Sequence, residues 1–106
     1  MKKAIFPEGV EDFEEIPNIG ESMAEDLRSL GLKHPQDLKK QNPYELYVKL
    51  CRKTKSYQDP CVLDVFISAV YFMKGKGVKM WWEFTPERKK NFHIVASEIA
   101  TLKLKK

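Results

Sequence analysis

The sequence is poor in the residues that most metal and redox sites require. It has two cysteines and two histidines in 106 residues, and they follow one another as His34, Cys51, Cys61 and His93 without a close pair. Protein zinc sites usually take ligands from closely spaced pairs, and two cysteines make no disulfide framework. We therefore expect no metal site, no cofactor and two reduced thiols.

Long apolar runs are also missing. No segment approaches the roughly 20 apolar residues that cross a membrane. The positively charged start, residues 1–7, lacks the apolar stretch of a secretory signal that would follow it. With 42% hydrophobic and 32% charged residues, the chain is typical of one folded domain, residues 1–106. The sequence thus predicts a cytoplasmic protein with no membrane partner.

Sequence motifs of common enzymes are absent as well. There is no glycine-rich phosphate loop with a lysine, no nucleophile elbow and no paired carboxylates at a useful spacing. A helix N-terminus lowers the pKa of a thiol, whereas burial in an apolar helix raises it, and we expect burial to dominate at Cys61. We interpret His93 as structural. The sequence predicts that the protein is not an enzyme.

Prolines and glycines divide the chain into short pieces of helical period, which predicts an all-α fold of about six helices. Asn42-Pro43, Asp59-Pro60 and Thr85-Pro86 each place a cap residue before a proline at the first helical position. The expected helices cover 10–16, 21–30, a short segment from Pro35, a segment from Pro43, 60–73, and a last helix from Thr85 that reaches Leu102.

Residues 60–73 predict a central helix, because only Asp64 and Ser68 are plainly polar in three turns. These two share a narrow face with Tyr71, which we interpret as a hydrogen-bonded strip in or near the core. The last helix has an apolar stripe that either closes the core or forms a homodimer seam. That stripe consists of Phe92, Val95, Ile99 and Leu102.

Positive charge is concentrated in the second half of the chain. Residues 1–48 have six Lys or Arg and ten Asp or Glu, a net charge of −4, whereas residues 49–106 have thirteen and five, a net charge of +8. An anionic partner is therefore expected at the second half. Trp81 and Trp82 in this region either stack on nucleic-acid bases or anchor a loop. The candidate cations around them are Lys74, Lys76, Lys79, Arg88, Lys89 and Lys90.

The segment FEEIPNIGESMAEDLRSLGLKHPQDLKKQNPYELYVKL resembles a helix-hairpin-helix module, which would cover residues 10–54 and leave the rest of the domain to 60–106. The continuation LCRKTKSYQDPCVLDVFISAVYFMKGKG, followed by WWEFTPERK, is similar to a small bacterial pathogenicity-locus family of helix-hairpin-helix proteins. A more distant similarity is to the C-terminal domain of TfoX-type competence regulators. Together these resemblances cover about residues 12–90.

The resemblance implies a fold and a class of ligand. Helix-hairpin-helix modules bind DNA or RNA backbones without sequence specificity, and the amides of the turn meet phosphates. Asn18, Ile19 and Gly20 correspond to that turn, with Asn18 at a position where a glycine is usual. Asparagine tolerates the left-handed conformation. Glu21 departs from the pattern, because relatives tend to have a basic residue there, and its negative charge opposes a phosphate.

Two hypotheses of function follow. The first is weak, non-sequence-specific binding to the DNA or RNA backbone through the hairpin turn and the basic residues. The alternative is a protein–protein interaction or homodimerisation module in which the hairpin is architectural and its acidic helix meets a basic partner. The sequence does not distinguish DNA, RNA and protein as the partner.

Overall fold

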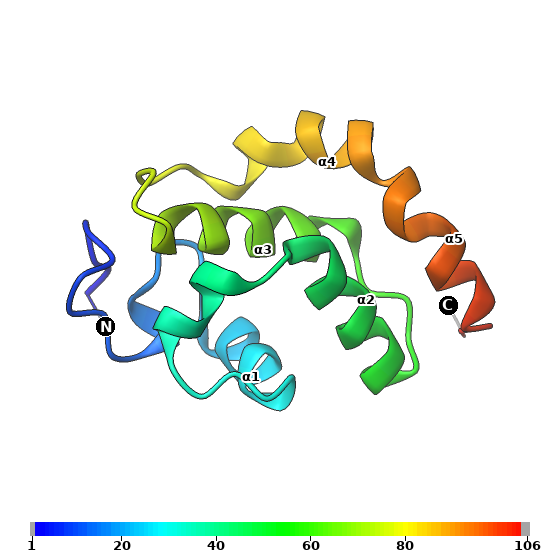
Figure 1. Ribbon diagram of the computed structural model, residues 1–106, viewed down its shortest axis with the longest axis horizontal. Helices are drawn as coiled ribbons and strands as arrows, with labels where there is room; N and C mark the ends of the chain where they lie inside the picture. The colour runs from blue at the N-terminus through cyan, green and yellow to red at the C-terminus, as the bar shows by residue number, and fades with distance from the viewer. Residues whose placement is uncertain (1, 105–106) are drawn as a thin grey trace.

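A computed structural model of the chain describes residues 2–104, so the first residue and the last two of the predicted domain lie outside the described part. The described chain is all-α and forms a single domain, as predicted (Figure 1). Its elements are η1 (Phe13–Glu15), α1 (Glu21–Ser29), η2 (Pro35–Lys40), α2 (Pro43–Thr54), α3 (Pro60–Met73), η3 (Trp81–Phe84), α4 (Thr85–Asn91) and α5 (His93–Thr101), where η denotes a 3-10 helix.

Helix α3 is the centre of the fold. It runs across the middle of the molecule, with α4 along one side and α2 and η2 along the other (Figure 1). Nine of its residues are buried, and they include the polar Asp64 and Ser68. A helix that is apolar on nearly all sides is stable only when other elements cover every face. The prediction of a buried central helix is therefore confirmed.

Asparagine and aspartate caps begin the two longest helices as predicted. The Asn42 side chain accepts a hydrogen bond from the backbone N–H of Tyr44 at 2.9 Å, one residue after Pro43. Asp59 accepts from the backbone N–H of Cys61 at 2.8 Å in the same way. Each cap satisfies one N–H that the first helical turn leaves without a partner.

The predicted two-turn helix over residues 10–16 is wrong. Only the single 3-10 turn η1 forms there, and the backbone N–H of Asp12 donates to Glu15 at 2.9 Å to start it. The apolar residues of the segment are nevertheless buried, at Val10, Phe13 and Ile16. Because Pro17 follows at once, the segment is too short to propagate a helix.

The predicted last helix is two helices, α4 and α5, which meet at Phe92 and differ in direction (Figure 1). The Phe92 ring lies edge-on to Tyr47 of α2, with centroids 6.1 Å apart. The turn at Phe92 brings α5 against α2, where Val95 and Ile99 are buried. The apolar stripe of this segment therefore closes the core.

No helix within residues 2–104 combines the length and the apolar character that crossing a bilayer requires.

Candidate nucleic-acid interface

The hairpin turn between η1 and α1 has the conformation that its residues predict. Asn18 is left-handed, with φ of +72°. The Ile19 side chain is fully buried and plugs the turn. Gly20 is exposed and precedes the first residue of α1, with φ of −92°. The turn therefore presents backbone N–H groups at a helix N-terminus, the usual arrangement for contact with an anion.

The side chain of Asn18 joins this turn to the basic loop, residues 74–80. Its Nδ2 donates hydrogen bonds to Ser68 Oγ at 2.7 Å and to the Lys79 carbonyl at 2.8 Å. Ser68 Oγ lies 3.2 Å from the same carbonyl. The turn and the lysines are separate candidate sites in the sequence, yet the fold makes them neighbours across 61 residues of sequence.

Two lysines of the basic loop converge on one aromatic ring. Lys76 Nζ lies 6.0 Å from the centroid of the Tyr71 ring, and Lys79 Nζ lies 5.2 Å from the same centroid. Gly75 and Gly77 have φ of +79° and +116°, which allow the loop to fold back over α3. Among residues 2–104, no carboxylate forms an ion pair with either ammonium group. The loop therefore concentrates positive charge that the described chain does not neutralise.

The end of η2 extends this positive charge. A groove of about 580 Å³ is lined by Lys39 and Lys40 of η2 together with Lys74 and one acidic residue, Glu87. Lys39 and Lys74 also share a second, smaller groove. Sequence reasoning missed Lys39 and Lys40, because two lysines in the last turn of a helix are an ordinary complement to the helix dipole. We define the basic surface as Lys39, Lys40, Lys74, Lys76 and Lys79.

Arg88 does not belong with these exposed cations. Its Nε lies 2.9 Å from Oδ1 of Asp64, whose side chain is 0% exposed, and only 13% of the Arg88 side chain is exposed. Thr85 Oγ1 donates to the same carboxylate at 2.7 Å. The Asp64 carboxylate raises the pKa of Arg88 further above its usual value. The role of Arg88 in ligand contact stays a prediction, and the structure disfavours it because the charge of Arg88 compensates a buried carboxylate.

The prediction of a hydrogen-bonded strip on α3 is confirmed for Asp64 and Ser68, whereas Tyr71 contacts Lys76 and Lys79 through its ring. Asp64 binds Thr85 and Arg88, and Ser68 binds Asn18.

Lys89 and Lys90 follow Arg88 on α4 and are exposed. They remain the candidate cations of that helix.

The outer side of the hairpin is acidic. A pocket of about 350 Å³ lies beside Gly20, and the carboxylate residues that line it are Glu14, Glu21 and Glu25. Lys3 in the same pocket donates to the backbone carbonyls of Glu14 and Ile19. Burial lowers the pKa of Lys3. A phosphate approaching the amide of Gly20 would meet these carboxylates, so the turn is a weaker anion site than the basic surface.

The two tryptophans differ in exposure. Trp82 is 53% exposed, whereas Trp81 is half-buried. Their rings meet edge to face, with centroids 5.5 Å apart and an interplanar angle of 84°. The interpretation that both anchor the loop in the core is therefore wrong for Trp82.

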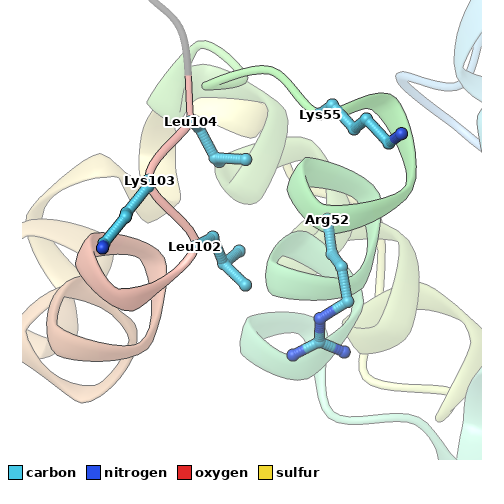
Figure 2. A pocket seen from close by; sticks show the side chains of 5 residues that line it. All are labelled: Arg52, Lys55, Leu102, Lys103 and Leu104. Atoms are coloured by element: carbon cyan, nitrogen blue, oxygen red, sulfur yellow. The ribbon is translucent and has the colours of Figure 1, made fainter.

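A further pocket, of about 430 Å³, lies between the end of α2 and the segment after α5 (Figure 2). Leu102 and Leu104 point into it, whereas the side chains of Lys55 and Lys103 point away (Figure 2). Because its cations diverge, this pocket does not concentrate charge as the basic loop does.

Both cysteines are free thiols. Burial, followed by the neighbouring Asp59, raises the pKa of the Cys61 thiol, and Cys51 is buried. In the part of the chain that the structure describes, no three His, Cys, Asp or Glu residues are grouped as a metal site would require.

Comparison with known proteins identifies the family. A family model described as pathogenicity locus matches residues 7–90. The chain belongs to this pathogenicity locus family. A relative from Streptomyces lavendulae, named mitomycin resistance protein McrB, is 34% identical over 79 residues, which cover 74% of this chain and 75% of the relative. No solved structure gives a match. The pathogenicity locus match includes the hairpin, α3, the basic surface and Lys90, and it ends before α5.

Proposed function

We propose that this protein binds the backbone of nucleic acids, DNA in the first place, weakly and without sequence specificity, through the basic surface and the neighbouring Lys89 and Lys90. The observation that carries this proposal is the convergence of Lys76 and Lys79 on the ring of Tyr71 without a carboxylate partner. Like charges held together repel one another. A row of phosphates relieves that repulsion and releases its own counterions on binding.

The hairpin has a mainly architectural part in this proposal. Asn18 positions the Lys79 backbone, and Ile19 holds the turn in the core. The exposed amide of Gly20 is a secondary phosphate contact, limited by the acidic pocket beside it. The left-handed Asn18 between η1 and α1 supports a relation to helix-hairpin-helix proteins and, more distantly, to TfoX-type regulators. That relation is part of the proposal.

A binding protein suits the site better than an enzyme does. The pKa of the Cys61 thiol is raised, which disfavours the nucleophilic thiolate, and the Asp64 carboxylate is already bound by Arg88 and Thr85. The name of the S. lavendulae relative describes a resistance phenotype, which a binding protein or an enzyme could confer. The proposal therefore rests on geometry and charge. A cytoplasmic location stays a prediction.

The test is fluorescence anisotropy with labelled duplex DNA, single-stranded DNA and RNA of equal length, measured between about 50 and 200 mM salt. We expect affinity to fall steeply with salt. In the variant Lys74→Gln/Lys76→Gln/Lys79→Gln, the slope of log K against log salt should become shallower by about 2.7 on duplex DNA if all three lysines contact phosphates.

The matched control removes three lysines elsewhere. Lys49 and Lys53 of α2 and Lys55 directly after it are exposed, and the end of α2 lies far from the loop that follows α3 (Figure 1). Their replacement by glutamine changes the net charge equally, yet it should leave most of the affinity. Equal losses in the two triple variants, or no binding by the unaltered protein at the lowest salt, would contradict the proposal.

A second candidate function is protein interaction through the acidic hairpin. The observation that favours it is the pocket lined by Glu14, Glu21 and Glu25. Arg28 already pairs with Glu14 and Glu25, so the charge offered to a basic segment of a partner is mainly that of Glu21. Homodimerisation through the stripe of α5 is less favoured, because Val95 and Ile99 are buried within the chain. Replacing Glu21 and Glu25 by glutamine should lower the affinity for such a partner. The affinity for nucleic acid should stay unchanged or increase.

A further inference from the structure

Exposed apolar side chains occur within and directly after the basic loop. Seven large apolar residues are exposed in the described chain, and three of them occur within five residues, at Val78, Met80 and Trp82. We call these three the apolar ridge. A cluster of exposed apolar side chains rimmed by charge marks an interaction site more often than scattered exposed residues do. The remaining four, Ile5, Phe6, Tyr57 and Ile94, lie in other segments.

The ridge contains an exposed aromatic side chain. Trp82 meets Trp81 edge to face, and such a contact covers at most one face of the Trp82 ring. The acidic neighbour, Glu83, is engaged locally, since its carboxylate accepts a hydrogen bond from the backbone N–H of Met80 at 2.7 Å. Trp82 is 53% exposed, so part of its surface is available to stack on another flat ring.

A cation of the basic loop lies close to Trp82 along the chain. Lys79 and Trp82 are three residues apart, so their Cα atoms are at most about 11 Å apart. The Lys79 backbone is held by Asn18 and Ser68, which fixes the base of the ridge on α3. The site thus combines a backbone-tracking charge with a stacking face. This is the combination that single-strand-binding proteins use for successive nucleotides.

We infer that the apolar ridge is a stacking platform for the bases of single-stranded nucleic acid, with Trp82 as its central residue. This inference rests on the proposed function and specifies its ligand. In a duplex the bases already stack on one another, so the face of Trp82 gains nothing from them. An anionic membrane is the competing surface, but the irregular backbone of residues 76–80 would leave peptide groups without partners in hydrocarbon.

Three ligands of equal length separate these contributions: oligo(dT), a duplex, and an abasic strand that keeps the phosphates and lacks the bases. We expect Trp82→Leu to weaken oligo(dT) binding about 5- to 150-fold, the range for one stacked base. The same change should alter duplex and abasic-strand affinity less than twofold. Trp82→Phe should restore part of the oligo(dT) affinity, and oligo(dT) should quench the fluorescence of Trp82 in the unaltered protein.

Tyr57→Leu is the matched control, because Tyr57 is an exposed aromatic residue before α3, and it should leave all three affinities unchanged. An unchanged oligo(dT) affinity in Trp82→Leu would overturn the inference while the lysine variants still support backbone binding. An equal loss of affinity for all three ligands would assign Trp82 a structural role and would also overturn the inference. A stronger blue shift of tryptophan emission with phosphatidylserine vesicles than with oligo(dT) would assign the ridge to membranes. Absence of binding to every oligonucleotide would defeat the proposed function itself.

Discussion

At the scale of single residues, Asn18 has the most consequential position. Its backbone adopts a left-handed conformation that few non-glycine residues tolerate, and its side chain binds Ser68 and the Lys79 carbonyl. Glycine would supply the conformation alone, whereas asparagine supplies the conformation and the link to the basic loop. Asparagine at this left-handed position therefore has a structural reason.

Substitution of Asn18 should separate these two contributions. Asn18→Gly keeps the conformation and loses the hydrogen bonds, and should lower the free energy of unfolding by about 1–2 kcal/mol. Asn18→Ala also places a β-carbon in the left-handed region, which adds about 1–2 kcal/mol. Urea unfolding measures both. Wild-type stability in Asn18→Gly would show that the side chain does not hold the loop.

The buried pair of Asp64 and Arg88 allows a second prediction. Arg88→Met should lower the free energy of unfolding by about 3–5 kcal/mol, because it leaves the buried carboxylate without its cation. Glu25→Gln is the control, since it removes one partner of Arg28 at the surface, and we expect no measurable change. Urea unfolding of both variants would contradict the interpretation if their losses were similar.

At the scale of elements, the break at Phe92 decides what the C-terminal stripe does. A continuous helix would follow the direction of α4, whereas the turn at Phe92 brings α5 onto α2. The Phe92 ring packs against Tyr47 at this corner. Helix α4 therefore packs against α3, whereas α5 packs against α2. The apolar stripe makes its contacts within the chain.

Shortening a buried side chain of α5 tests this packing. Ile99 is fully buried, so Ile99→Ala should lower the free energy of unfolding by about 2–5 kcal/mol. Ile94, which is exposed on the same helix, is the matched control. Ile94→Ala should change the free energy of unfolding by less than about 0.5 kcal/mol. Thermal or urea unfolding measures both variants. A change of molar mass in Ile99→Ala, with little loss of stability, would favour a homodimer seam instead.

At the scale of the whole molecule, charge is distributed unevenly. Acidic side chains surround the hairpin pocket, and lysines from η2 and the basic loop form a separate surface. Several carboxylates have local stabilising partners. The Arg28 guanidinium lowers the pKa of Glu14, the His34 backbone N–H lowers that of Asp37, and the Cys61 backbone N–H lowers that of Asp59. Burial raises the pKa of Asp26. This carboxyl group therefore opposes the stabilising effect of the other three at neutral pH.

These shifts predict acid sensitivity. A carboxyl group whose pKa is lower in the folded than in the unfolded state stabilises the fold at neutral pH, and that stabilisation is lost as the pH falls through the folded-state pKa. We expect the urea concentration at the midpoint of unfolding to decrease when the pH is lowered below about 4. Asp59→Asn keeps a good helix cap and removes one titrating group, so its midpoint should depend less on pH. A steeper dependence in Asp59→Asn would contradict this account.

Local signals in the sequence predict much of the fold correctly. The caps at Asn42 and Asp59, the left-handed Asn18 and the central helix all follow from a few adjacent residues, because caps, turns and helical period are short-range properties. The helix expected over residues 10–16 failed, since its length could not offset the cost of helix nucleation. The single last helix failed because packing on α2, a long-range property, turns the chain at Phe92.

The sequence by itself determined an all-α chain with a buried central helix, a hairpin turn and a basic second half, because period, capping and charge are read along the chain. Only the tertiary structure decided which charges are available. It places Arg88 against Asp64, brings Lys39 and Lys40 beside Lys74, and leaves Trp82 exposed. These outcomes depend on contacts between residues far apart in sequence, and burial, the quantity that separates a structural cation from a ligand-binding one, exists only once the chain has folded.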